Sequence, residues 1–200
     1  DSHCHLTATA FREDREAVLR SAYDAGVTRL VCIASNLSDA KDALAFAESV
    51  TERRGAEGKA VEVPEVWSTA GVHPHEAGAA KPGDVEEIGT LARENDRVVA
   101  IGETGLDYFY DTAPRETQRA LFDAHLALGA ETGLPVVVHA READDDIAAA
   151  IRGMPGGTMG VLHCFTGGEQ AFAAAMDAGW YVSFSGIASF RSFEAVELLR

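Results

Sequence analysis

Thr28-Arg-Leu-Val-Cys-Ile-Ala34 is a short, mostly apolar run rich in β-branched residues. Such a run is typical of a strand that is buried on both faces, as in a parallel sheet. A helical pattern over residues 12–25 precedes it and ends at Gly26, and Ser38 can cap a second helix that runs to about Arg53. The stretch therefore lies in a repeating β/α unit.

The same unit recurs along the whole chain, with a surface loop expected over residues 55–65. We expect strands over about residues 1–6, 28–34, 66–72, 97–102, 135–139, 160–165 and 180–185. Strands that alternate regularly with helices imply a parallel sheet whose connections are right-handed crossovers. A doubly wound sheet is possible, but a TIM (β/α)8 barrel is favoured. In a doubly wound sheet, functional residues gather at the one point where the strand order reverses, whereas here candidate functional residues lie at the end of nearly every predicted strand.

The chain is expected to be a single TIM-barrel domain over residues 1–200 that is incomplete at both ends. It begins at Asp1 inside a predicted strand and stops at Arg200 inside an apolar, periodic segment. About seven strands are present, and the eighth strand and its helix are absent. We therefore expect residues 1–200 alone to be marginally stable, because an unclosed barrel leaves unpaired strand edges.

The composition is that of a soluble globular protein, with 46% hydrophobic and 24% charged residues. No apolar run approaches the roughly 20 residues of a membrane span, so we expect a cytoplasmic protein with no membrane association. Cys4, Cys32 and Cys164 are odd in number and include no C-x-x-C pair. This favours reduced, buried thiols over a disulfide framework or a zinc ribbon.

The formal net charge of −15, with 14 Arg and 3 Lys, argues against sequence-independent wrapping of duplex DNA, which uses a basic face. The simplest interpretation is solubility, or an origin in an acidic, high-salt proteome. A site for phosphate groups is still compatible with this charge if bound cations make the local field positive.

Histidines at predicted strand ends indicate a metal site. His3 and His5 are two residues apart, so in an extended strand their imidazoles lie on the same face. Two imidazoles held in this way provide half of the ligands for a divalent metal. Glu103, His139 and His163 end later strands, and the ends of parallel barrel strands meet at one mouth. Four imidazoles and one carboxylate exceed one tetrahedral site but suit two nearby metals, which Glu103 could bridge.

Each of these histidines taken alone is more simply a core or loop residue, and only the set favours metal binding. The turn Gly71-Val-His-Pro-His75 would aim His73 and His75 inward, either toward a ligand or as plain turn chemistry. His125 lies in the middle of a predicted helix, where we expect a structural or solvent-facing role.

Three further residues are candidates for contact with a substrate. Arg141 shares a face with His139 and could hold a phosphate oxygen, or form a salt bridge with the acidic run 142–146. Asp107 and Tyr108 could orient the metal ligands from behind or contact substrate, although a loop cap explains them nearly as well. We expect the strand aromatics to belong to the core and not to a base-stacking platform: Phe165, Tyr181 and Phe184.

Several motifs resemble those of the TatD family of metal-dependent deoxyribonucleases in the amidohydrolase superfamily, and they occur in the same order along the chain as in that family. The spacing of Arg115, Gln118 and Phe122 and the strand Tyr181-Val-Ser-Phe-Ser-Gly186 are also similar to the family pattern. The main motifs are Asp1-Ser-His-Cys-His-Leu6, Gly71-Val-His-Pro-His75, Ile101-Gly-Glu-Thr-Gly-Leu-Asp-Tyr108, Pro135-Val-Val-Val-His-Ala-Arg141 and Leu162-His-Cys-Phe-Thr-Gly167.

The resemblance implies a TIM barrel that holds two or three divalent ions (Mg, Mn or Zn) at its mouth. His3, His5 and Glu103 would hold one metal, and Glu103, His139 and His163 another, with Glu103 as the catalytic bridging group. Apart from the resemblance, we predict that the substrate contacts His73, Arg141, Asp107 and Tyr108. The family also uses an aspartate of a Glu-Thr-Asp motif at strand eight, and no such motif follows Gly186 here, so the activity of residues 1–200 alone is in doubt.

The predicted function is hydrolysis of phosphodiester bonds in DNA, near strand ends or in single strands, by attack of a metal-activated water. No stable protein partner is expected. One alternative is a metal-dependent hydrolase of a small amide, lactone or phosphoester, because barrels change substrate through their loops. A second is a protein that binds nucleic acid with metal and does not cleave it.

Overall fold

Six parallel strands form one curled sheet in the computed structural model, which describes residues 1–55, 62–191 and 193. Each strand pairs with the next one in the sequence, so the spatial order is the chain order. The strands are β1 (Arg29–Cys32), β2 (Glu65–Ala70), β3 (Val98–Asp107), β4 (Val136–Arg141), β5 (Gly160–His163) and β6 (Tyr181–Val182).

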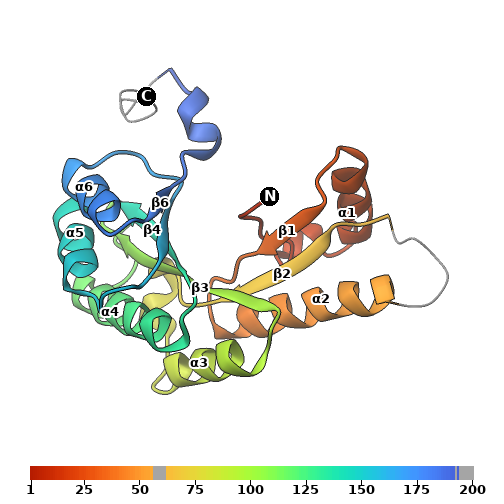
Figure 1. Ribbon diagram of the computed structural model, residues 1–200, viewed down its shortest axis with the longest axis horizontal. Coiled ribbons are helices and arrows are strands. Elements are labelled where there is room, and N and C mark those ends of the chain that lie inside the picture. Colours follow the sequence, from red (N-terminus) through yellow and green to blue (C-terminus); the bar gives the residue numbers. More distant parts are fainter. Residues whose placement is uncertain (56–61, 192, 194–200) are drawn as a thin grey trace.

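Helices connect successive strands and lie along the outer face of the curl (Figure 1). They are α1 (Arg15–Asp24), α2 (Leu37–Gly55), α3 (Asp84–Glu94), α4 (Arg115–Thr132), α5 (Asp144–Gly153) and α6 (Glu169–Asp177). Three short 3-10 helices are η1 (Thr9–Phe11), η2 (Pro74–Ala79) and η3 (Ser185–Ser189). The arrangement confirms the predicted parallel α/β architecture of barrel type.

The N-terminal segment differs from the prediction, because residues 1–6 form one isolated bridge and not a regular strand. Cys4 pairs in parallel with Cys32 of β1. The Cys4 N–H donates to the Val31 carbonyl at 3.1 Å, and the Ile33 N–H donates to the Cys4 carbonyl at 2.8 Å. The segment thus lies beside β1, where the predicted first strand was expected, and His3 and His5 flank Cys4 next to the C-terminal end of β1.

Other predicted boundaries also shift. The fourth predicted strand continues to Asp107, because β3 goes on pairing with β4 beyond a register shift between Ile101 and Thr104. The last predicted strand is reduced to the two residues of β6. The predicted loop over residues 55–65 falls partly on residues 56–61, which lie outside the described residues.

Glycines allow β3 to approach its neighbours closely. A Cβ atom on Gly71, which follows β2, would lie 2.4 Å from the Cα atom of Gly102. Gly105 has a φ of +126°, and a Cβ atom there would lie 2.1 Å from the His139 carbonyl oxygen of β4. These contacts fix β3, and with it Glu103, tightly between the two neighbouring strands.

Two clusters of buried side chains form the core. The larger joins β2–β5 to α3–α6 around residues such as Phe122 and Phe165, and the smaller packs α1 and α2 against β1. The predicted core role of Phe165 is confirmed, whereas Tyr181 is 69% exposed and the prediction for it is wrong. It lies on β6, a strand of only two residues at one edge of the described sheet.

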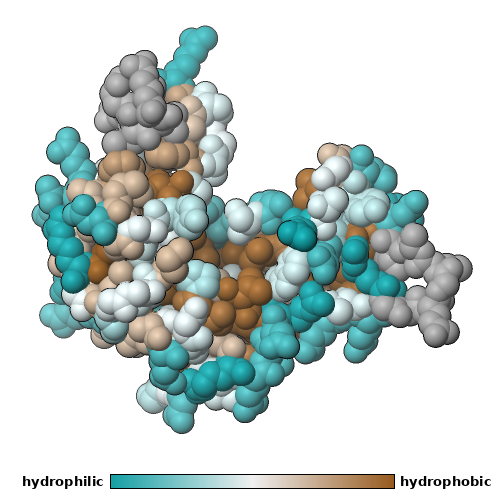
Figure 2. Space-filling model, in the orientation of Figure 1, coloured by the Kyte–Doolittle hydropathy of each residue, from teal (hydrophilic) through white to brown (hydrophobic). Residues whose placement is uncertain are grey.

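The concave side of the curl holds a cavity of about 650 Å³. Apolar side chains gather between the two arms of the molecule in Figure 2. His3 and His163 contribute to the lining together with Val137 and Val161. The cavity therefore borders the predicted metal ligands.

The three cysteines are free thiols, as predicted. Cys32 is buried, but Cys4 and Cys164 are partly exposed, so the expectation of three buried thiols holds only for Cys32. Among the described residues, no helix is long and apolar enough to cross a membrane.

Candidate metal centre

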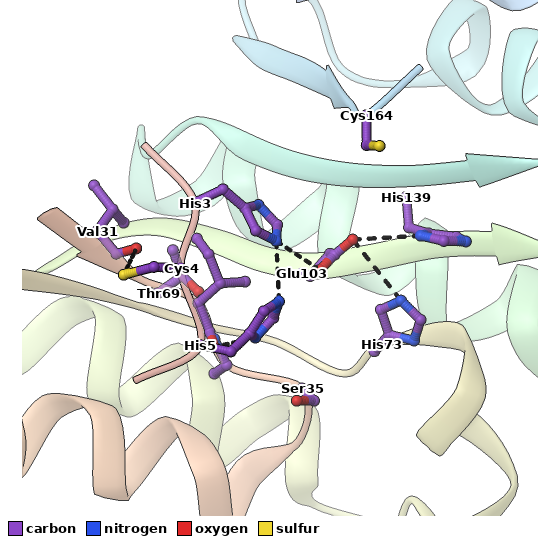
Figure 3. A network of polar contacts seen from close by, with 12 residues as sticks. His3, Cys4, His5, Val31, Ser35, Thr69, His73, Glu103, His139 and Cys164 are labelled. Atoms are coloured by element: carbon purple, nitrogen blue, oxygen red, sulfur yellow. Dashed lines mark hydrogen bonds and ion pairs between the residues drawn. The ribbon is translucent and has the colours of Figure 1, made fainter. Parts of the chain in front are cut away.

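Glu103 lies at the centre of a cluster of histidines from separate segments, of which Figure 3 shows the N-terminal segment (His3, His5), the turn after β2 (His73) and β4 (His139). Its side chain is carried by β3, and the residue is only 3% exposed. The Glu103 N–H donates to the Ala34 carbonyl at 3.0 Å, just beyond β1. A carboxylate buried in this way needs charged or hydrogen-bonding partners to stay ionised.

One oxygen of Glu103 faces the N-terminal segment. Its Oε2 lies 3.3 Å from His3 Nε2, and His3 Nε2 lies 3.1 Å from His5 Nε2. His5 Nδ1 donates to the Ile33 carbonyl at 3.1 Å, so its Nε2 keeps a free lone pair that points at His3. The His163 ring stacks on that of His3, with centroids 3.4 Å apart.

The other oxygen of Glu103 faces a second group of histidines. Its Oε1 lies 3.4 Å from His139 Nδ1 and 3.8 Å from His73 Nε2. Figure 3 shows His73 and His139 on one side of the carboxylate and His3 with His5 on the other. This is the arrangement expected of a carboxylate that bridges two cations.

Asp107 supports the second group from the opposite side. Its buried Oδ2 lies 2.8 Å from His75 Nε2 and 2.9 Å from His139 Nε2. The two nitrogens of His139 thus face two different carboxylates. A carboxylate on the outer nitrogen fixes the orientation of an imidazole and raises its basicity as a ligand.

Within the described part of the chain, three groups of side chains have potential ligand atoms within 4.8 Å of one another. Two of them share Glu103, and this donor set of imidazoles with a carboxylate fits a divalent transition metal. Two imidazole Nε2 atoms at 3.1 Å also call for a proton or a cation between them. The groups are His3, Glu103 and His163; His73, Glu103 and His139; and His75, Asp107 and His139.

The pKa values of these groups favour an ionised Glu103 beside neutral His73 and His163. Burial lowers the pKa of His139, but hydrogen bonds with Glu103 and Asp107 outweigh it and raise the pKa of His139 above its usual value. Burial raises the pKa of Glu103, but hydrogen bonds from His139 and His3 outweigh it and hold the pKa well below its usual range. Burial lowers the pKa of His73 and that of His163 to about 4. Both rings are therefore neutral near pH 7, as a metal ligand must be.

Residues 1–200 match the sequence profile of a family described as TatD related DNase. The chain belongs to the TatD family. A 3′-5′ ssDNA/RNA exonuclease TatD from Pantoea ananatis is 37% identical over 187 residues, which cover 93% of this chain and 67% of the relative. One of the same name from Klebsiella pneumoniae is 36% identical over 190 residues, which cover 93% of this chain and 66% of the relative. The chain thus spans about two thirds of the length of these curated relatives.

Solved structures of TatD proteins share the fold. A TatD homologue from Escherichia coli superposes with a TM-score of 0.85 at 28% identity, over 100% of this chain and 73% of the other. A TatD family hydrolase from Entamoeba histolytica gives 0.77 at 26% identity, over 91% and 63%. An amidohydrolase from Saccharomyces cerevisiae, at 18% identity, 0.69 and coverage of 90% and 66%, shares the fold alone. These likenesses confirm the resemblance drawn from the motifs.

Within this TatD chain, the histidines are grouped differently from the expected ligand sets. The resemblance placed His163 with His139 and Glu103. In the structure, His163 lies with His3, and His73 takes the place beside His139. His139 and His163 are register partners on β4 and β5, so the difference lies in the direction of the rings.

Arg141 and Tyr108 take different positions relative to this centre. The Arg141 guanidinium stacks over the rings of Phe109 and Tyr110, at 4.2 and 4.9 Å from their centroids. Among the described residues, it forms no salt bridge with the acidic run 142–146. Tyr108 points instead toward α4 and α5, where its hydroxyl donates to Asp146. The aromatic pair beside Arg141 was missed, because the predicted strand ended at residue 102 and the structure extends β3 to Asp107.

His125 is structural and fully buried, so the solvent-facing alternative is wrong. Its Nδ1 donates to the Leu121 carbonyl at 2.7 Å, and its Nε2 accepts from the Val72 N–H at 3.1 Å. It thus ties α4 to the turn that carries His73 and His75. No sequence pattern distinguishes such an inward-facing helical histidine from an exposed one.

Proposed function

We propose that this protein is a metal-dependent nuclease that hydrolyses phosphodiester bonds of single-stranded DNA or RNA near strand ends. The observation that carries the proposal is the buried Glu103 carboxylate, whose two oxygens face separate groups of imidazoles. The names of the TatD relatives, 3′-5′ ssDNA/RNA exonucleases, support the substrate class.

The side chains would have three roles: metal binding, phosphate contact and positioning of the ligands. Glu103 would hold two divalent ions (Mg, Mn or Zn), shared with His3, His5 and His163 on one side and with His139 and His73 on the other. Such ions supply Lewis acidity at the phosphate and activate water for attack on phosphorus. Arg141 would contact a phosphate oxygen beside the histidines, and Asp107 would hold His139 and His75 in place.

An acidic protein can bind a polyanionic substrate if positive charge at the mouth attracts the phosphate groups locally. The formal net charge is −15, but among the described residues the candidate ligand groups combine five imidazoles with the Glu103 and Asp107 carboxylates, and Arg141 is the register partner of Asp107. Bound divalent ions would add positive charge where a phosphate arrives.

We further propose a single TIM-barrel domain, a cytoplasmic location and no stable protein partner.

The test is cleavage of a 5′-labelled single-stranded oligonucleotide by the purified full-length protein with Mn²⁺. A ladder of products shortened from the 3′ end, lost on chelation, is expected. Metal-dependent turnover of small esters or lactones without oligonucleotide cleavage would favour the small-substrate alternative. Metal-dependent binding of the oligonucleotide without products would favour the binding protein.

A further inference from the structure

Two adjacent aromatic side chains are exposed at the mouth of the curl. Phe109 and Tyr110 lie two and three residues beyond the end of β3, and the residues are 50% and 56% exposed. Their rings meet edge to face with centroids 4.8 Å apart. An exposed apolar side chain is ordinary when it stands alone, but a contiguous group beside a cluster of potential ligands indicates a contact surface.

The loop that carries these rings is held firmly. Asp107 Oδ1 accepts from the N–H groups of Phe109 and Tyr110, at 3.1 and 2.9 Å. The buried Gln118 accepts from the Asp107 N–H at 2.9 Å and donates to the Ala113 carbonyl at 2.9 Å. The two rings are therefore presented on a fixed turn, with little conformational entropy to lose on contact with a ligand.

Positive charge lies against the same rings. The Arg141 guanidinium is 4.2 Å from the Phe109 centroid and 4.9 Å from that of Tyr110. The Tyr110 ring is 5.3 Å from that of His75, which shares Asp107 with His139. Aromatic faces beside a cation that can meet a phosphate are the combination that binds unpaired nucleotides. An apolar peptide would gain nothing from the guanidinium.

We propose that Phe109, Tyr110 and Arg141 form a stacking platform for a nucleobase of a single strand, with the neighbouring phosphate at the Glu103 centre. The proposal rests on the proposed function and adds the means by which single strands are chosen. Bases of a duplex are stacked on one another and cannot offer a face to the platform without being unstacked first. Sequence preference is expected to be weak, because every base has such a face.

The experiment measures binding of a fluorescent single-stranded oligonucleotide by anisotropy, with Mn²⁺ and the full-length protein. Its linkages are phosphorothioates that resist cleavage, and a second oligonucleotide lacks the bases of its two 3′-terminal nucleotides. The double variant Phe109→Ala/Tyr110→Ala should bind the complete oligonucleotide at least about tenfold more weakly than the wild type. On the abasic oligonucleotide, the two proteins should differ by less than about twofold.

Three further variants guard against a general loss of structure. Phe109→Leu keeps apolar volume without a ring, and Phe109→Trp enlarges the ring, so affinity should follow Trp, Phe, Leu in decreasing order. Met176→Ala removes an exposed apolar side chain from α6, on the outer helix layer, and should bind like the wild type. Equal binding by the double variant and the wild type, or an equal loss on both oligonucleotides, would overturn the platform.

Cleavage of the unmodified oligonucleotide separates this proposal from the function on which it rests. A wild type that cleaves normally, with a double variant that binds normally, contradicts the platform alone. Binding that depends on the bases and on the two rings, without cleavage, supports the platform and contradicts the nuclease. A wild type that neither binds nor cleaves contradicts both.

Discussion

At the scale of residues, the site depends on which atom of each side chain faces which neighbour. His139 shows this clearly, because its Nδ1 faces Glu103 while its Nε2 faces Asp107. Asp107 uses its second oxygen to accept from the Phe109 and Tyr110 N–H groups. One buried carboxylate thus orients a potential metal ligand and shapes the adjoining aromatic turn.

Asp107→Asn tests this positioning role, since the variant keeps the volume and loses the charge. We expect metal affinity and nuclease activity to fall about 10- to 100-fold, the usual effect of losing an outer carboxylate partner. Titration calorimetry with Mn²⁺ and oligonucleotide cleavage measure the two effects. Asp111→Asn is the matched control, because Asp111 is exposed and its positive φ of 51° is tolerated by asparagine. If the two variants behave alike, Asp107 has no positioning role.

At the scale of elements, much of the arrangement was predictable. Alternating apolar runs and helical patterns located β1–β5, and the parallel order then brought Glu103, His139 and His163 to one edge. The ring directions that group His163 with His3 were not predictable, because they depend on side-chain packing between segments far apart in the chain. The turn after Asp107 and the burial of His125 depend in the same way on tertiary contacts.

Gly105 tests the close packing of β3 against β4. Gly105→Ala should lower the free energy of unfolding by about 3 kcal/mol, because the added Cβ meets the His139 carbonyl and the positive φ is unfavourable for alanine. Urea denaturation measures the change. Gly156→Ala is the control, since a Cβ there meets nothing within 4 Å, and should change stability by less than about 0.5 kcal/mol. Equal effects would show that β3 and β4 are not tightly packed.

The contribution of the buried His125 on α4 to the stability of the fold depends on pH. Burial lowers its pKa from 6.5 to about 4, so between these values the unfolded chain takes up a proton that the folded chain does not. Stability from this residue is therefore present above pH 6.5 and is lost as the pH falls toward 4, by up to about 3 kcal/mol.

Unfolding of wild type and His125→Leu, measured from pH 7.5 to 4, isolates this contribution from those of other histidines. The variant should be less stable at pH 7.5 by about 1–3 kcal/mol, because the Val72 N–H loses its acceptor. The difference between the two proteins should shrink as the pH falls. A difference that stays constant over this range would contradict a neutral, buried His125.

At the scale of the whole molecule, the candidate ligands come from the N-terminal segment, β3, β4 and β5, so bound metal would tie the two ends of the curl together. Mn²⁺ at a hundred times its dissociation constant should raise the free energy of unfolding by about 2.7 kcal/mol over the chelated protein. Thermal unfolding with Mn²⁺ or EDTA measures this. An equal rise in Glu103→Gln would place the metal elsewhere on the acidic surface.

Glu103 is expected to bridge metal ions held by histidines from both ends of the sheet. Anomalous diffraction at the manganese edge, from crystals soaked in Mn²⁺, tests it most directly. We predict two peaks, one on each side of the Glu103 carboxylate, which are lost or greatly weakened in Glu103→Gln. Peaks that lie away from Glu103, or that persist unchanged in the variant, would contradict the account.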